Sequence, residues 1–227
     1  MAQPISPIAE KAAARDYAVL YLDPWTRKHK LNAENLSTIL SAFEKPLPRW
    51  LDLACGQAWH FSLFPERAWM VGLDISPAQL ARAHARVPTA QFVRGDLTRT
   101  SFPKASFDLV TNFWAGYCYL DSRDAIARLW SSAVDWIAPG GALYVEVLLG
   151  EDLESYNRSP FSGRTGFTVS PRSEDYGEWE YEDSGGRHLM TSPPLEDFLR
   201  IVIPAFDRVE TCHDGFMVHL IATGRRG

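Results

Sequence analysis

The stretch "LDLACGQAWH", residues 51–60, stands where a nucleotide-binding α/β fold has the glycine-rich turn after its first strand. In the pattern G-x-G-x-x-G the first glycine makes a tight turn, the second lets a pyrophosphate approach the backbone, and the third packs helix on strand. Ala54, Gly56 and Ala58 retain only the middle glycine. Trp59 is bulky where the diphosphate of a dinucleotide would need room. The stretch therefore predicts a cofactor loop that disfavours NAD and suits a ligand without phosphates.

Strands and helices alternate on both sides of this loop. Short runs that are apolar on both faces predict a buried parallel sheet, and they lie at 50–54, 69–74, 90–96, 107–113 and 141–149. Two further strands, 206–212 and 216–224, are joined through Asp214-Gly215, a hairpin pattern. Helices are expected at 8–22, 31–44, 76–87, 121–137 and 194–203, with Ser76 and Asp121 as N-caps and Pro77 at a first helical position. This order of elements predicts an α/β fold.

Residues 150–192 interrupt the alternation. They are polar, rich in Gly, Ser and aromatic residues, and alternate in character within "EWEYED" and "RHLMTS", which indicates a small antiparallel sheet. We therefore expect four parts in the chain. They are N-terminal cap helices at 1–45, a cofactor-binding α/β core at 46–149, a substrate lid inserted at 150–192, and a helix and hairpin at 193–227 that complete the core.

Length, composition and charge limit the classes of function. The 227 residues, 46% of them apolar, fit one compact domain or one domain with an insertion. The formal net charge of −5 disfavours an extended nucleic-acid surface. The one basic run, "TRKHK" at 26–30, is expected to be a solvated face, with a contact to a carboxylate or phosphate as the lesser alternative. The sequence thus favours small uncharged or cationic partners over nucleic acid.

The cysteines, histidines and N-terminus bear on compartment and metal content. Cys55, Cys118 and Cys212 are odd in number and form no CxxC pair, which favours a reducing compartment over disulfides or a zinc site. The histidines lack metal-ligand spacing, so no metal is expected. The N-terminus has no apolar signal core and no stretch suits a membrane span. We therefore expect a cytoplasmic protein, as a monomer or homodimer, that does not enter a membrane.

Carboxylates follow the second and third predicted strands. Asp74 ends the second strand, at the spacing from the cofactor loop where a carboxylate accepts hydrogen bonds from both ribose hydroxyls. In "RGDL", residues 94–97, Asp96 is placed to accept from an adenine amine, and the Leu97 N–H to reach a ring nitrogen. Ligands bind at the carboxyl ends of the strands in such sheets. These residues predict binding of an adenosine group.

Together, the segments 51–58, 71–75, 94–97, 107–113 and 137–147 resemble the class I S-adenosylmethionine-dependent methyltransferases. The loop is most similar to the D-L-A-C-G-T-G-x-H loops of small-molecule N-methyltransferases of the amino-sugar and glycine type. The resemblance implies a doubly wound, mostly parallel, seven-stranded Rossmann-like sheet with a small antiparallel lid insertion, and S-adenosylmethionine as cofactor. It implies these cofactor-binding residues: Tyr21, Asp52, Ala54, Cys55, Gly56, Asp74, Ile75, Asp96, Leu97, Asn112 and Phe113.

Such enzymes surround the positively charged sulfonium with aromatic residues from the leading helix and from the segment after the fourth strand. Tyr17 and Tyr21 share one face of the predicted helix, although ordinary packing explains them equally well. Methyl transfer is an in-line displacement that depends on alignment and needs no metal or covalent nucleophile. From "NFWAGYCYL" at 112–120 and from the lid, we expect acceptor contacts at Trp114, Tyr117, Tyr119, Trp179 and His188.

The remaining polar candidates keep two interpretations each. Tyr117 and His188 are candidate catalytic residues, although His188 and His213 also fit exposed or packing positions. His60 is expected to be structural, bonded to backbone or to a carboxylate. Glu146 lies within a buried strand, so it must reach a polar partner or face the pocket.

The sequence favours a small-molecule methyltransferase with an amine nitrogen as acceptor, or otherwise a hydroxyl or carboxyl oxygen. An RNA or protein methyltransferase is an alternative that should show a basic groove or an N-P-P-Y-like segment, whereas residues 112–115 are "NFWA". The altered loop leaves a third alternative, a non-catalytic module that retains the fold. The acceptor itself cannot be identified from the sequence.

Overall fold

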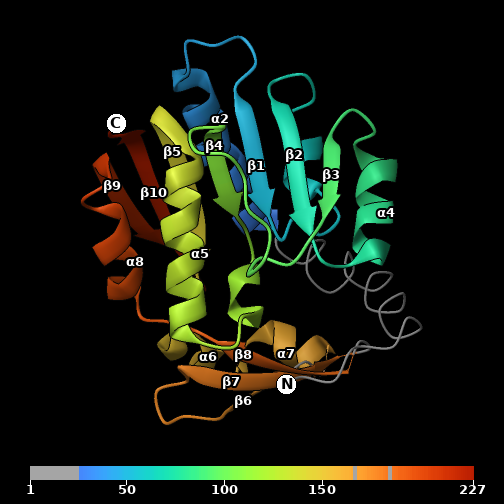
Figure 1. Cartoon of the computed structure of the whole chain (residues 1–227). Coiled ribbons are helices and arrows are strands. Elements are labelled where there is room, and N and C mark those ends of the chain that lie inside the picture. Colours follow the sequence, from blue (N-terminus) through green and yellow to red (C-terminus); the bar gives the residue numbers. More distant parts are fainter. Residues whose placement is uncertain (1–25, 166–167, 184–185) are drawn as a thin grey trace.

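The computed structural model describes residues 26–165, 168–183 and 186–227 (Figure 1). The predicted helix at 8–22, with Tyr17 and Tyr21, lies outside these described residues.

A seven-stranded sheet forms the centre of the molecule, in the order β3-β2-β1-β4-β5-β10-β9. All pairs are parallel except those of β10, which runs antiparallel to both β5 and β9. The predicted fold class is confirmed. The strands are β1 (Arg49–Leu53), β2 (Trp69–Asp74), β3 (Gln91–Arg94), β4 (Phe107–Asn112), β5 (Ile137–Val147), β9 (Phe206–His213) and β10 (Val218–Arg225).

Helices cover both faces of this sheet, as a doubly wound fold requires. On one face α5 (Arg123–Trp136) and α8 (Leu195–Val202) pack in a core cluster that includes Leu51 and Val145. On the other face Trp50 packs in a second cluster with residues of three helices. These helices are α2 (Thr26–Ala42), α3 (Trp59–Ser62) and α4 (Pro77–Arg86).

The face of the sheet that α2 covers is polar toward the carboxyl ends of the strands. Because side chains alternate along a strand, Leu143 and Val145 of β5 face α5 while Tyr144 and Glu146 face α2. His219 of β10 pairs with Glu146 in the antiparallel register. Buried groups that can form hydrogen bonds thus meet between β5, β10 and the first turns of α2.

Local details differ from the predictions in ways that have clear causes. Ser76 caps α4 as predicted, but the N-cap of α5 is Ser122 rather than Asp121, because its hydroxyl accepts the Ala125 N–H at 3.2 Å. Helix α2 is described from Thr26 onward, so it includes at least the five residues before the predicted start at 31, among them the buried Lys28 and His29. The predicted turn at 138–141 lies within the long strand β5.

The insertion contains the predicted antiparallel sheet, in the order β6-β7-β8. Its strands are β6 (Val169–Pro171), β7 (Glu178–Asp183) and β8 (Gly186–Thr191), preceded by two short helices that were not predicted, α6 (Gly150–Tyr156) and α7 (Pro160–Thr165). Figure 1 shows the small sheet beyond the arrowheads of β1 and β2, at the carboxyl edge of the large sheet. Among the described residues, no helix has the length and apolar character that a membrane crossing requires.

Candidate functional site

The loop after β1 follows the path of a glycine-rich turn with alanines in it. Ala54, Gly56 and Ala58 all have left-handed backbone conformation, with φ of 53°, 51° and 55°. A residue with a Cβ pays about 1–2 kcal/mol for this conformation, and glycine does not. The loop keeps the geometry of a glycine-rich turn despite this unfavourable free energy, so the alanines do not abolish a cofactor turn.

Asp74 at the end of β2 holds this loop in place. Its Oδ2 accepts the Gly56 N–H at 2.8 Å, and its Oδ1 accepts the Ser76 N–H at 2.9 Å. The Cys55 N–H donates to the Leu73 carbonyl at 3.0 Å. Burial raises the pKa of the Cys55 thiol well above its usual value, so this sulfur is neutral and is not an activated nucleophile. Asp74 therefore has a structural task in addition to the ribose contact predicted for it.

Asp96 and Leu97 follow β3, next to the end of β2. Asp96 accepts the Thr98 N–H at 2.8 Å and the Thr98 hydroxyl at 2.7 Å, both at Oδ1. Ile75, after β2, has an exposed side chain. These predicted adenosine-binding residues share one edge of the sheet with Asp74, although they are not among the residues that line the pocket described next.

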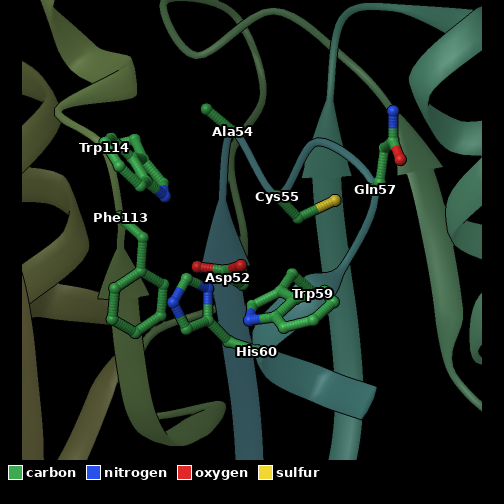
Figure 2. A pocket seen from close by; sticks show the side chains of 8 residues that line it. All are labelled: Asp52, Ala54, Cys55, Gln57, Trp59, His60, Phe113 and Trp114. Carbon is green, nitrogen blue, oxygen red and sulfur yellow. The ribbon is translucent and has the colours of Figure 1, made fainter. Parts of the chain in front are cut away.

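A small pocket, partly open to solvent, lies at the carboxyl ends of β1 and β4 (Figure 2). It brings together four predicted cofactor residues, Asp52, Ala54, Cys55 and Phe113, and one predicted acceptor residue, Trp114. The other lining residues are Gln57, Trp59 and His60.

Asp52 lies at this pocket with almost no solvent exposure. Its Oδ1 accepts the Thr111 hydroxyl at 2.7 Å. Burial raises the pKa of Asp52 to about 8, and the nearby carboxylates of Asp74 and Glu146 add to the shift. The carboxyl group is therefore largely protonated at neutral pH.

Aromatic rings form the rest of the pocket wall. His60 stacks on Phe113 with 3.6 Å between ring centroids, and burial lowers the pKa of His60 well below its usual value. Its Nε2 lies 3.1 Å from Asn32 Nδ2, so this histidine bonds to a side-chain amide. The predicted partner, a backbone group or a carboxylate, was wrong. The His29 ring lies 5.4 Å from that of Trp59 and 5.9 Å from that of Trp114. The wall is thus aromatic and largely uncharged.

Two buried polar atoms, one in the pocket lining and one at the end of β4 outside that lining, lack hydrogen-bond partners among the described residues. They are the indole Nε1 of Trp59, a donor, and the Oδ1 of Asn112, an acceptor. Figure 2 shows the Trp59 nitrogen on the side of the ring toward Asp52 and His60. Asn112 ends β4 and donates through Nδ2 to the Leu53 carbonyl at 2.6 Å. Buried polar groups normally find partners, so we expect a water molecule or a ligand at this donor and at this acceptor.

Two predicted acceptor residues lie in the core instead of against this pocket. Tyr117, in the short helix η3 (Gly116–Tyr119), is fully buried, packs edge-on against Trp130 and Phe198, and accepts the Leu148 N–H at 3.1 Å. Trp179 is buried and donates to the Ser192 hydroxyl at 2.9 Å. Their aromatic character indicated a pocket, but it serves the packing of η3 and the small sheet.

Tyr119 and His188, the other two acceptor candidates outside the pocket, lie together near the small sheet. The Tyr119 and Tyr181 hydroxyls are hydrogen-bonded to each other, and His188 stacks on Tyr181 at 4.5 Å. The Tyr119 ring lies 5.7 Å from the His188 ring. His213 Nε2 is hydrogen-bonded to Asp152 Oδ1 of α6 at 2.8 Å. It belongs neither to the pocket lining nor to the group of Tyr119, Tyr181 and His188.

Sequence reasoning missed Lys28 and His29 as residues of the site. The basic run at 26–30 was expected to be a solvated face, which is wrong for these two buried side chains. Lys28 contacts the Glu146 carboxylate, so the lesser alternative, a carboxylate contact, applies. The signal was present: Glu146, inside an apolar strand, required a polar partner.

Comparison with known proteins agrees with the fold and with the loop. The methyltransferase domain family matches residues 51–141. Over 100 residues, 42% of this chain, the sequence is 33% identical to phthiotriol/phenolphthiotriol dimycocerosates methyltransferase of Mycobacterium leprae (strain TN), of which the match covers 36%. It is 32% identical over 117 residues, 48% of the chain, to trans-aconitate 2-methyltransferase of Acidovorax sp. (strain JS42), covering 42% of that protein. The matches thus span well under half of these relatives.

Solved structures are similar over nearly the whole chain. DesVI of Streptomyces venezuelae has a TM-score of 0.67 at 20% identity, over 92% of this chain and 98% of that one. CalS10, an amino pentose methyltransferase from Micromonospora echinaspora solved with S-adenosylmethionine bound, has a TM-score of 0.62 at 19% identity, over 98% of this chain and 100% of that one. At such identities the likeness shows the fold. The chain therefore has the class I, Rossmann-like methyltransferase fold, and its residues 51–141 match the methyltransferase domain family.

Proposed function

We propose that this chain is an S-adenosylmethionine-dependent methyltransferase that acts on a small molecule, with an amine nitrogen as the methyl acceptor. One observation carries the proposal. Within the region that matches the methyltransferase domain family, the pocket at the carboxyl ends of β1 and β4 has a buried donor on Trp59. Asn112, which ends β4 outside the pocket lining, has a buried acceptor, and neither atom is partnered among the described residues. An amino-acid group carries both complements, a carboxylate for the indole N–H and an ammonium for the amide oxygen. The methionine part of the cofactor is such a group.

The residues around the pocket fit the remaining parts of the cofactor. Asp74 would hold the ribose, and Asp96 with the Leu97 N–H would hold the adenine, since all three follow neighbouring parallel strands. The left-handed Gly56 lets the ligand approach the loop backbone. Trp59, Phe113 and Trp114 present aromatic rings to a sulfonium, which ring faces stabilise.

S-adenosylmethionine supplies a methyl group activated by its positively charged sulfur. The chain contributes alignment and exclusion of water, because in-line displacement accelerates when the reacting atoms are held at about 3–3.5 Å. A neutral amine attacks through its own lone pair and requires no general base on the enzyme. Two solved structures with this fold are described as an amino pentose methyltransferase and a sugar N-methyltransferase, which supports an amine acceptor here.

The small sheet supports an acceptor site at the carboxyl edge. Strands β6, β7 and β8 lie beyond the ends of the central strands, and Tyr119, Tyr181 and His188 form an aromatic group there. We propose that this insertion is a lid over the acceptor. The three cysteines are free thiols, which fits the reducing conditions of the cytoplasm. A monomer or homodimer that binds no nucleic acid completes the proposal, since the net charge is −5.

Calorimetry followed by acceptor screening tests the function. S-adenosylhomocysteine, the demethylated product, should bind and NAD should not. A panel of amines, amino sugars, hydroxy compounds and carboxylic acids is then incubated with methyl-labelled cofactor, and label transfer to an amine is the expected result. Tight NAD binding without binding of the sulfonium cofactor would refute the proposal. Cofactor binding with no transfer to any acceptor would favour a non-catalytic module.

A further inference from the structure

Trp114 has a strained backbone where it meets the pocket. Its φ is 57°, and that of the next residue, Ala115, is 48°. Left-handed conformation is rare for a bulky residue, and two such residues in succession are rarer still. Strain of this kind persists only where surrounding contacts enforce it, and it is found most often at binding and catalytic sites. The contacts that enforce it here come from two residues distant in sequence.

Glu146 and Lys28 hold Trp114 from its backbone and from its ring. The Trp114 N–H donates to Glu146 Oε2 at 2.6 Å. The Lys28 ammonium donates to Glu146 Oε1 and lies 4.8 Å from the centroid of the Trp114 ring. A charge-assisted hydrogen bond and a cation–π contact therefore act on the same strained residue. Lys28 comes from α2, Glu146 from β5, and Trp114 from the segment after β4.

The groups that surround this contact include charges of both signs and are withdrawn from water. The side chains of Lys28 and Glu146 are 3% and 0% exposed. Lys28 Nζ lies 3.8 Å from Asp214 Oδ2, which accepts His219 Nε2–H at 2.9 Å. Burial alone would raise the pKa of Asp214, but its contacts with His219 and Lys28 hold the pKa well below its usual range. His219 Nδ1 also lies 3.9 Å from Glu146 Oε1.

A buried ion pair of this kind adds little to stability. The desolvation of both charges offsets much of their attraction, and apolar replacements of a whole pair are often neutral or stabilising. A pair that served only to join α2 to β5 could thus be replaced without loss. Here one oxygen of the Glu146 carboxylate accepts the backbone N–H of Trp114, and an apolar side chain could not make that hydrogen bond.

We propose that Lys28 and Glu146 are positioning residues of the pocket: the carboxylate fixes the backbone of Trp114, and the ammonium fixes both the carboxylate and the indole ring. The inference rests on the proposed function in one respect: the ring of Trp114 is held in a fixed position beside the cofactor and the acceptor. Removal of both charges should leave the fold intact and should loosen Trp114. Affinity for S-adenosylhomocysteine should fall about tenfold, equivalent to about 1.4 kcal/mol.

The test combines the double variant Lys28→Met/Glu146→Gln with a direct view of Trp114. Incorporation of ¹⁵N-tryptophan labels eight backbone amides, and the variant Trp114→Phe identifies the one of interest. In the wild type this amide proton should lie far downfield and exchange slowly, because its hydrogen bond is short and charge-assisted. In the double variant it should shift upfield and exchange faster, while the thermal midpoint stays near that of the wild type and affinity for S-adenosylhomocysteine falls.

Asp108→Asn provides a matched control on the opposite end of β4. Asp108 is also buried and paired, with Lys45 at 2.6 Å, but it lies far from the pocket lining. This variant should lower stability and leave the Trp114 signal and the affinity unchanged. A folded double variant with an unchanged Trp114 resonance would overturn the inference. If the wild type failed to bind S-adenosylhomocysteine, the proposed function would fall, whereas the resonance would still test the positioning role.

Discussion

The carboxyl group of Asp52 links the pocket to pH. Because burial raises its pKa to about 8, the group is mainly neutral in the free protein at pH 7. S-adenosylmethionine carries a net positive charge, and a net positive charge at this pocket favours the charged form of Asp52 and lowers that pKa. We therefore expect S-adenosylmethionine binding to release a proton. The affinity should rise with pH, by up to about tenfold per unit for one proton, and should level off above the free-state pKa near 8.

Calorimetry in two buffers of different ionisation enthalpy measures the proton released on binding. Asp52→Asn still offers an oxygen to the Thr111 hydroxyl but has no proton to lose, so its affinity should vary little with pH. The same shift affects folding. Since the folded-state pKa exceeds the ordinary aspartate value of 3.8, the contribution of Asp52 to stability is present below about pH 3.8 and is lost as pH rises toward 8. An equal pH dependence of the affinity in the wild type and in Asp52→Asn would show that the released proton does not come from Asp52.

The contact between the cofactor loop and η3 depends on one glycine. A Cβ on Gly116 would lie 2.6 Å from the Cβ of Ala54, which is too close for either backbone to remain in place. Gly116→Ala should therefore lower the free energy of unfolding by about 1–3 kcal/mol. Ala54→Gly in the same chain should restore most of it, because it removes the Cβ that the new methyl group would meet, and glycine also tolerates the φ of 53° at that position. Urea unfolding of the four proteins measures the coupling.

Gly163→Ala is the control for this cycle, since a Cβ at Gly163 meets nothing within 4 Å. It should change stability by no more than about 1 kcal/mol. Additive effects of Gly116→Ala and Ala54→Gly would show that the two residues do not contact each other in solution, because contacting residues couple.

His188 on strand β8 tests how the acceptor is activated. If an amine attacks unaided, His188→Phe should retain kcat/KM within a few fold, because the ring on Tyr181 is preserved. His188→Ala should lose more through the missing stack, yet much less than the roughly 10²–10⁴-fold of a lost general base. Steady-state kinetics with the acceptor found by screening measures both. Losses of that size in both variants would instead identify His188 as a base.

Strands and helix caps were predictable where local chemistry decides them. The apolar runs at 69–74 and 107–113 and the cap at Ser76 agree with the structure to within a residue, because burial on both faces and capping geometry leave few alternatives. Helices α6 and α7 were missed, since they are short and α6 depends on burial of Leu153 and Tyr156 in the core. Tertiary packing, which a local pattern does not contain, decides such elements.

The position of the candidate site was predictable from the sequence, but the roles of Lys28 and Tyr117 were not. The loop, Asp74 and Asp96 could be proposed because their places after parallel strands follow from topology, and their contacts with a cofactor stay predictions. Lys28 and Tyr117 were assigned incorrectly, as a solvated residue and a pocket wall, because each role depends on a partner more than 25 residues away, Glu146 for one and Leu148 for the other. Spacing along the chain carries no signal for such contacts.

At the scale of the whole molecule, the two faces of the sheet have separate tasks. The face under α5 and α8 is an apolar core, whereas the α2 face holds the buried polar chain from Asp214 through His219, Tyr144 and Asn32 to His60 at the pocket. Each neighbour in this chain lies within 3.1 Å of the next. The pocket is therefore braced from the C-terminal hairpin, while the small sheet at the carboxyl edge remains available to respond to ligands.

Hydrogen exchange tests that division. If residues 150–192 are a lid, β7 and β8 should exchange more slowly when S-adenosylhomocysteine and acceptor are bound together, because closure protects amides that open readily in the free protein. The central strand β4 is fully buried and should be unchanged, so it serves as the internal control. S-adenosylhomocysteine alone should protect mainly the loop after β1, since its contacts lie there. Unchanged exchange in β7 and β8 with both ligands bound would mean that the insertion has a fixed structural role and that the acceptor is enclosed by the pocket residues alone.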